Sequence, residues 1–298
     1  MIRISNLTKR FGEKAAISNL SIDINSGLIG LVGHNGAGKS TLFRLISGVY
    51  APTDGEILID GHPSYTKEAK ESIFFLPDDP FYPNGSDIDG VLSFYKTFYD
   101  VDVEKFREII KQFNLPYNKK VRVFSKGMKR LLFIALTLSI NCKILLMDEA
   151  FDGLDPVVLE TVKYHILKIY AENRIIILSS HNVSALEKLV DKFIIIHEGE
   201  LKSDGDIDYL GETYEKYQAI FAKECSEDIL KNLGLNVISY KKIGSIVNFV
   251  VNRKKTDDIE KAVKGLEPKL LENVSIDANE IILLQMLEAK KEASYENK

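Results

Sequence analysis

Two kinds of hydrophobic pattern alternate in the middle of the chain. The apolar runs at 144–147, 175–178 and 193–196 contain no polar residue, which is typical of parallel strands covered on both faces. The stretches 156–171 and 184–188, which lie between these runs, have helical spacing. The resulting order of strand, helix, strand, helix, strand predicts a parallel α/β domain.

The first half of the chain has different periods. Residues 2–4 and 20–24 alternate between apolar and polar, which predicts half-buried β structure. The apolar run at 28–32 predicts a strand, and residues 42–46 continue as a helix. From Ile88 to about Leu138 the apolar spacing is mostly helical, and we interpret this segment as a helical insert on the parallel sheet.

The pattern changes again after about Gly211. Strand-like and helix-like stretches then follow in the order βαββαβ plus a final helix, which is compatible with a small ferredoxin-like domain. We therefore expect a first domain at residues 1–210, with a helical insert at about 78–142. An accessory C-terminal domain is expected at residues 211–298.

Composition limits the classes of function. The net charge of −4 argues against a nucleic-acid surface as the main binding partner. The longest apolar stretch, 131–140, is too short to span a bilayer, and the N-terminus lacks the apolar core of a secretory signal. Cys142 and Cys225 lie far apart without metal-ligand spacing, as expected of reduced thiols. We expect a soluble cytoplasmic protein.

The first candidate site is a glycine-rich loop. Residues 33–41 read Gly-His-Asn-Gly-Ala-Gly-Lys-Ser-Thr and match the phosphate-binding pattern of glycine, four residues, Gly-Lys-Ser/Thr. The loop precedes a predicted helix, so backbone N–H groups and the helix dipole can both face a polyphosphate. Lys39 would reach the β- and γ-phosphates, and the Ser40 hydroxyl would bind Mg²⁺. The predicted nucleotide-binding residues of this loop are Gly33, Asn35, Gly36, Ala37, Gly38, Lys39, Ser40 and Thr41.

Two carboxylates follow the buried run at 144–147. Asp148 and Glu149 stand at its C-terminal end, which is the edge where parallel sheets bind ligands. Asp148 can hold Mg²⁺, and Glu149 can accept a proton from an attacking water or orient that water. A solvated acidic turn is the alternative, but the neighbouring phosphate loop favours the catalytic interpretation.

A second anion site is predicted at residues 124–130, which read Phe-Ser-Lys-Gly-Met-Lys-Arg before an apolar helix. Ser125 is a natural N-cap, and the helix start, Lys126 and the backbone of Gly127 together form the site. A basic residue is unfavourable at a helix N-terminus unless an anion is near. The alternative is a plain capped helix with a basic first turn.

These motifs resemble those of the ATP-binding cassette (ABC) family over residues 1 to about 210, in the order the family has them. Residues 33–41 resemble its Walker A loop and residues 144–149 its Walker B strand. Residues 124–128 resemble its signature motif, which separates the family from other P-loop proteins, and residues 150–155 its D-loop. The resemblance implies an α/β P-loop cassette with an antiparallel β subdomain and a helical insert, followed here by the small C-terminal α+β domain.

The resemblance also implies roles for single residues. His181, after the run 175–178, resembles the switch histidine of the family, and Phe11 resembles the aromatic residue that stacks on adenine. Taken alone, both residues have structural alternatives. The predicted catalytic residues are Lys39, Glu149 and His181.

Two positions depart from the commonest family pattern. Lys126 stands where a glycine is usual, and Asp78 stands where a glutamine is usual. An aspartate accepts hydrogen bonds but cannot donate an amide N–H, although it can approach Mg²⁺. An acidic residue here resembles some exporter cassettes and favours export over import, while a turn between Pro77 and Pro80 is the structural alternative. The predicted metal ligands are Ser40, Asp78 and Asp148.

The resemblance implies a head-to-tail dimer, either a homodimer or a heterodimer, with two ATP molecules at the interface. One subunit would supply the phosphate loop together with Asp148, Glu149 and His181. The other would supply Ser125 and Gly127. ATP closes such a dimer and hydrolysis opens it, and this cycle would drive a separate transmembrane permease.

We therefore expect an ATPase subunit of an exporter, located on the cytoplasmic face of the cell membrane, with no nucleic-acid partner. The permease would dock near the Asp78 loop and the helical insert. Five aromatic residues there either form that surface or belong to the core of the insert: Phe81, Tyr82, Phe94, Tyr95 and Phe98.

Two other functions remain as alternatives. A soluble cassette ATPase acting on ribosomes or DNA usually shows two cassettes, a long coiled coil or a basic surface, none of which is visible in the sequence. A P-loop small-molecule kinase would leave residues 124–128 unexplained.

Overall fold

The structure is a computed structural model that describes residues 1–171, 174–181, 183–206, 210–256 and 258–296. The chain divides into two compact units, Met1–Leu201 and Lys202–Lys298. The boundary falls within strand β10 (Glu200–Gly205), earlier than the expected position at residue 210. The polar residues of β10 continue a strand pattern, so the amino-acid sequence does not mark the domain boundary at this position.

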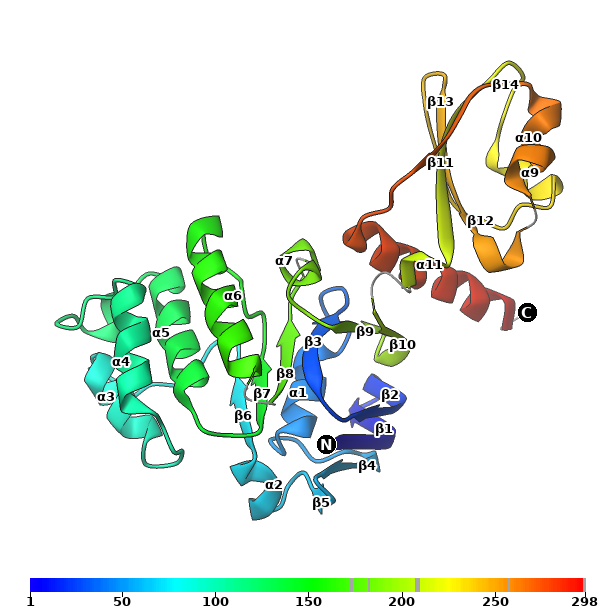
Figure 1. Ribbon diagram of the computed structural model, residues 1–298. Coiled ribbons are helices and arrows are strands. Elements are labelled where there is room, and N and C mark those ends of the chain that lie inside the picture. The colour runs from blue at the N-terminus through cyan, green and yellow to red at the C-terminus, as the bar shows by residue number, and fades with distance from the viewer. Residues whose placement is uncertain (172–173, 182, 207–209, 257, 297–298) are drawn as a thin grey trace. The chain divides into compact units, whose positions relative to one another are not determined.

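The first unit contains a six-stranded sheet made largely of the continuous apolar runs (Figure 1). Its other strands are β3 (Gly27–Val32), β6 (Ile73–Leu76), β7 (Ile144–Met147), β8 (Ile175–Ser179) and β9 (Lys192–His197). The order is β10-β9-β3-β8-β7-β6, and the pairs from β9 to β6 are parallel. All residues of β3, β7 and β8 are buried, which confirms the predicted parallel α/β core.

A smaller antiparallel sheet packs against this core. Its strands are β1 (Ile2–Phe11), β2 (Lys14–Ile24), β4 (Asp54–Ile59) and β5 (His62–Pro63), in the order β2-β1-β4-β5. Helix α1 (Lys39–Ile46) contributes Leu42 and the fully buried Phe43 to a hydrophobic core that also contains side chains of both sheets. This core ties the glycine-rich loop, which lies just before α1, to both sheets.

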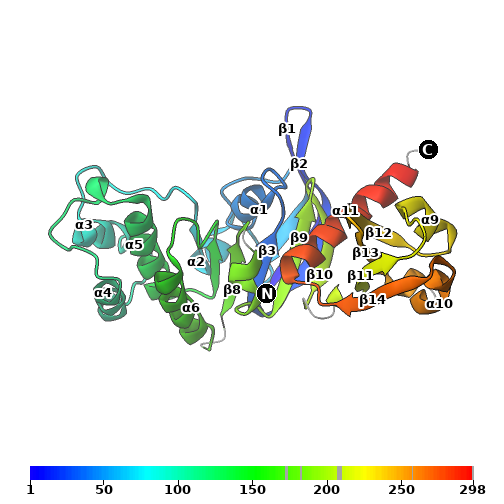
Figure 2. The ribbon, with the colours of Figure 1, turned by 90° about the horizontal axis from the view of Figure 1, so that it is seen from above.

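The helical insert leaves the main sheet after β6 and returns at β7. It contains α3 (Ile88–Tyr95), α4 (Val103–Gln112) and α5 (Lys126–Ser139), and it lies beside α6 (Pro156–Tyr170), as Figures 1 and 2 both show. Every residue of α5 from Arg130 to Ser139 is buried, as expected of a helix that is apolar on all sides. Two short helices, α2 (Lys67–Glu71) and α7 (Val183–Glu187), complete this unit.

The second unit is an antiparallel sheet with helices. Its elements are β11 (Tyr214–Phe221), α9 (Glu227–Asn232), β12 (Val237–Ile243), β13 (Ile246–Asn252), α10 (Ile259–Val263), β14 (Pro268–Val274) and α11 (Ala278–Glu296). The strand order β12-β13-β11-β14 inserts β13, antiparallel, between β11 and β12. This is the split βαβ arrangement of ferredoxin-like folds.

The two faces of this second sheet are covered differently. Phe249 and Val251 pack in a core with residues of α9 and α10. Val250 points the opposite way because side chains alternate along a strand, and it packs with Leu284 of α11. Glu288 of α11 accepts hydrogen bonds from Tyr214 and Asn252, which fixes this helix on the sheet.

Of the helices that the structure describes, none combines the length and the apolar character required to cross a bilayer.

Candidate functional site

The glycine-rich loop connects β3 to α1 and requires its glycines for steric reasons. Gly36 and Gly38 have φ angles of 83° and 110°, in the left-handed region that favours glycine. A Cβ atom on Gly33 would lie 2.4 Å from the carbonyl oxygen of Ile196, and one on Gly38 would lie 2.6 Å from that of Ala16. The loop is therefore pressed between β9 and β2, and its shape depends on residues without side chains.

Lys39 begins α1 and its side chain folds back across the loop. The side chain is only 5% exposed, and Nζ donates a hydrogen bond of 2.8 Å to the carbonyl oxygen of Gly33. The same Nζ lies 3.6 Å from Oε1 of Glu149. Two of the three predicted catalytic residues are thus neighbours, although they are 110 positions apart in the sequence.

A cavity of about 440 Å³ opens over the loop. It is lined by Phe11, Lys14, Ala16, Asn35, Gly36, Ala37, Gly38, Lys39, Ser40, Thr41 and Glu149. Lys14 and Ala16 were not predicted, because no local motif distinguishes them. The concave backbone with a buried ammonium at its base fits a polyphosphate.

Phe11 lies at the edge of this cavity and keeps 48% of its surface exposed. Its ring makes an edge-to-face contact with Tyr50 at 5.5 Å between centroids, and Nζ of Lys9 lies 5.2 Å from the Phe11 centroid. An exposed aromatic ring held by its neighbours is a suitable platform for a planar base.

The two carboxylates are held at the end of β7 by a residue that the sequence analysis missed. Ser179, the last residue of β8, donates from Oγ to Oδ1 of Asp148 at 2.6 Å. The same Oγ accepts the backbone N–H of Glu149 at 2.8 Å. The available signal was its position, since Ser179 directly follows an apolar run and therefore lies at the same sheet edge as Asp148.

Glu149 adopts a left-handed backbone conformation with φ at 47°. Such a conformation costs a residue with a side chain about 1–2 kcal/mol, so the surrounding contacts must hold it. Oε2 of Glu149 accepts hydrogen bonds from the backbone N–H and from Nδ1 of His181, at 3.3 and 2.9 Å. A carboxylate only accepts hydrogen bonds, so this contact places the His181 proton on Nδ1. Lys39, Glu149 and His181 therefore form one continuous row.

Arg130 is a second residue that the motifs did not reveal. Arg130 is 5% exposed, and its guanidinium donates hydrogen bonds to the carbonyl oxygens of Asp148 and Glu149 and, at 3.1 Å, to that of Pro77. Burial lowers the pKa of Arg130, and the charges of Asp78 and Asp148 act in the opposite direction. This side chain connects α5, the loop after β6 and the turn after β7.

Asp78 lines a different cavity from Ser40, another predicted metal ligand. In the part of the chain that the structure describes, it does not line the cavity over the glycine-rich loop. It borders a separate cavity of about 340 Å³, together with Asp79, Pro80, Tyr82, Lys126, Lys129, Arg130 and Phe133. Ser40 and Asp78 therefore line two different cavities.

The predicted second anion site lies at the start of α5. Ser125 is the N-cap, and its Oγ accepts the backbone N–H of Met128 at 3.1 Å. Neither Ser125 nor Gly127 lines the cavity over the glycine-rich loop. The predicted nucleotide-binding residues thus form two separate groups within one chain.

Known proteins match this chain over the segment that carries these motifs. The family model for ABC transporters matches residues 17–152. The bacitracin transport ATP-binding protein BcrA of Bacillus licheniformis is 34% identical over 227 residues, which cover 73% of each chain. The chain belongs to the ABC transporter ATP-binding proteins. The lantibiotic transport ATP-binding protein SrtF of Streptococcus pyogenes is 30% identical over 70% of this chain and 92% of that protein.

A further relative matches beyond the cassette. The ABC transporter ATP-binding protein YtrB of Bacillus subtilis is 27% identical over 95% of this chain and 97% of its own length, so the similarity extends into the second unit. The ATP-binding subunit of an ABC transporter has a TM-score of 0.66 at 23% identity, covering 71% of this chain and 92% of that chain. The dimeric cassette MJ0796 bound to ADP and Pi has a TM-score of 0.60 at 22% identity, covering 69% and 98%.

These comparisons confirm the predicted cassette fold, the binding of ATP and the assignment as an ATPase subunit of an ABC transporter. Subunits of this family dimerise as cassettes and pair with a membrane permease. The alternative of an ATPase acting on ribosomes gains no support.

Replacing Ser179 by alanine tests the hold on the two carboxylates. The change removes one hydrogen bond from Asp148 and one from the N–H of Glu149. We expect the free energy of unfolding to fall by about 1–3 kcal/mol and kcat for ATP hydrolysis to fall as well. The control is Ser139→Ala, which removes a buried hydroxyl bonded to Ala135 within α5. Equal kcat values for both variants would contradict the role of Ser179.

Proposed function

We propose that the chain is the ATPase subunit of an exporter and hydrolyses ATP at the loop 33–41, on the cytoplasmic face of the membrane. The observation that carries the reaction chemistry is the row formed by Lys39, Glu149 and His181. Export is supported by the acidic Asp78 and by similarity to a bacterial Atm1-family ABC exporter with ATP bound. That exporter is 25% identical with a TM-score of 0.62, covering 70% of this chain and 39% of that chain.

Glu149 is the group that accepts a proton from the attacking water. Its Oε2 is held by His181 and its Oε1 lies toward Lys39, so the carboxylate is oriented at both oxygens. Glu149 also lines the cavity, where a water between the carboxylate and the terminal phosphate can be activated. The Lys39 ammonium stabilises the negative charge of the phosphates, as do the backbone N–H groups of the loop.

Ser40 and Asp148 are the proposed Mg²⁺ ligands. A hydroxyl and a carboxylate are the hard oxygen donors that Mg²⁺ prefers, and Asp148 is 1% exposed with Oδ1 oriented by Ser179. Bound there, Mg²⁺ would neutralise part of the phosphate charge. Asp78 is not proposed as a ligand, because its neighbours are Lys126, Lys129 and Arg130.

Ser125 and Gly127 are proposed to contact the ATP held by a second subunit. This assignment is supported by their absence from the lining of the cavity over loop 33–41 in their own chain. The capped helix start presents N–H groups to an anion.

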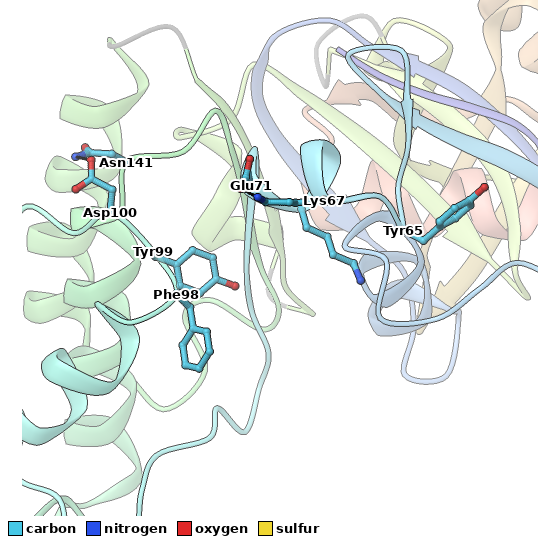
Figure 3. A pocket seen from close by; sticks show the side chains of 8 residues that line it. Tyr65, Lys67, Glu71, Phe98, Tyr99, Asp100 and Asn141 are labelled. Atoms are coloured by element: carbon cyan, nitrogen blue, oxygen red, sulfur yellow. Dashed lines mark hydrogen bonds and ion pairs between the residues drawn. The ribbon is translucent and has the colours of Figure 1, made fainter.

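The permease is proposed to dock on an aromatic row of the helical insert. The rings of Phe81 and Phe98 each lie against Phe94, with centroids 5.4 and 5.3 Å apart, and are themselves 66% and 68% exposed. Phe98 also lines a groove of about 570 Å³, whose walls are formed by the insert and by residues 65–71 (Figure 3). Tyr82 and Tyr95 instead are half-buried and pack against Phe133.

Replacing Glu149 by glutamine tests the reaction. The amide cannot accept the proton, so we expect hydrolysis to fall by about 10²–10⁴-fold while ATP binding persists. ATP should then trap a dimer, which size-exclusion chromatography would detect. Normal turnover, or a monomer in the presence of ATP, would overturn this role.

Mixing two inactive variants tests whether sites are shared between subunits. Lys39→Ala damages the loop and Ser125→Ala damages the second group, so a mixed dimer should retain roughly one intact site. We expect ATPase activity to reappear on mixing. If the mixture stays as inactive as its components, each site is contained in one chain.

Replacing Phe81 and Phe98 by serine tests the docking surface. We expect less of the protein to sediment with membranes of its source cells, because the two exposed aromatic rings of the proposed contact are removed. Basal ATPase activity should be unchanged. The control is Tyr164→Ser, which changes a similarly exposed aromatic residue on α6. Equal sedimentation of the wild type, the double variant and this control would exclude the proposed surface.

A further inference from the structure

Lys126 lies in the signature segment and is ion-paired within its own chain. It is the first residue of α5, and Nζ donates a hydrogen bond to Oδ2 of Asp152. This hydrogen bond raises the pKa of Lys126 and lowers the pKa of Asp152, so both groups are charged at neutral pH. A cation in the first turn of a helix opposes the helix dipole, and Asp152 supplies the compensating charge.

The backbones of the two segments also touch. A Cβ atom on Gly127 would lie 3.0 Å from the carbonyl oxygen of Gly153, and one on Gly153 would lie 3.9 Å from Cδ of Lys126. The signature segment and the D-loop segment are therefore in van der Waals contact. The Lys126–Asp152 pair lies over this contact at the surface, with side chains 69% and 34% exposed.

Asp152 is linked in turn to the catalytic carboxylate. Its backbone N–H donates to the carbonyl oxygen of Glu149 at 3.1 Å, and the guanidinium of Arg130 donates to the same oxygen. Lys126 and Arg130 are four residues apart and lie on one face of α5. This face therefore holds the turn after β7 at two points, and a shift of Asp152 changes the backbone position of Glu149.

We propose that Lys126 and Asp152 are positioning residues that couple the two ATP sites of the dimer. The inference rests on the proposed function, in which Ser125 and Gly127 contact the ATP of the other subunit. Lys126 lies between these two residues, whereas Glu149 acts on the ATP of its own chain. ATP bound at the start of α5 holds Lys126 in place, Lys126 holds Asp152, and Asp152 holds the turn that carries Glu149.

A double-mutant cycle tests this coupling. ATPase rates are measured against ATP concentration for Lys126→Gln, Asp152→Asn and the double variant. We expect each single variant to lower kcat by about fivefold to tenfold and to bring the Hill coefficient close to 1. The kcat of the double variant should fall no further than that of either single variant, because the same interaction is removed in all three. Lys126→Arg, which keeps the charge, should retain most of the rate and the cooperativity.

Two controls separate this effect from general loss of charge or fold. Lys129 lies in the same turn of α5, and its Nζ is 5.6 Å from the ring centroid of Tyr82. Lys129→Gln should therefore keep the wild-type kcat and Hill coefficient. Binding of a fluorescent ATP analogue to Asp152→Asn should be unchanged, since Asp152 does not line the cavity over loop 33–41.

The outcomes distinguish this inference from the function on which it rests. The coupling is overturned if both single variants keep the wild-type kcat and Hill coefficient, or if their losses of kcat add in the double variant. In either case, the proposed function still stands if ATP traps dimers of Glu149→Gln. Absence of any ATP-dependent dimer would overturn both.

Discussion

The turn after β7 depends on hydrogen bonds from outside its own strand. Glu149 has a left-handed backbone, which is unfavourable for a residue with a side chain, and Asp148 is a buried carboxylate. Ser179 satisfies one polar atom of each residue, and Arg130 satisfies both carbonyl oxygens. Because Arg130 also bonds to the loop after β6, the catalytic carboxylate, the helical insert and the neighbouring strands are mechanically connected.

This connection gives a physical meaning to the two unusual residues of the cassette. Lys126 supplies a cation where a glycine is common in the family, and Asp152 balances it from the D-loop segment. Asp78 supplies a carboxylate where a glutamine is common, and it lies among lysines and Arg130 rather than at the nucleotide cavity. Charge in this protein is thus added along the path from the insert to the catalytic turn.

Much of the fold and of the site could be predicted because the signals are local. A short apolar run such as β7 predicts a buried strand of a parallel sheet, and the glycines within residues 33–41 indicate a phosphate loop by their spacing. The βαββαβ order of the second unit could also be predicted from the periodicity of its apolar residues. The strand order within each sheet could not be predicted, because strands that pair are far apart in the sequence and no local pattern identifies their partners.

The amino-acid sequence by itself determined the candidate chemistry: a loop with the phosphate-binding pattern, a carboxylate pair at a strand end, and a capped helix start suited to an anion. These follow from residue type and spacing, which act over a few positions. Only the tertiary structure decided that Ser179 and Arg130 hold the turn of Asp148 and Glu149, that Lys126 meets Asp152, and that Asp78 and Ser40 line different cavities. These contacts depend on which strands and helices become neighbours, and that arrangement is set by packing of the whole core.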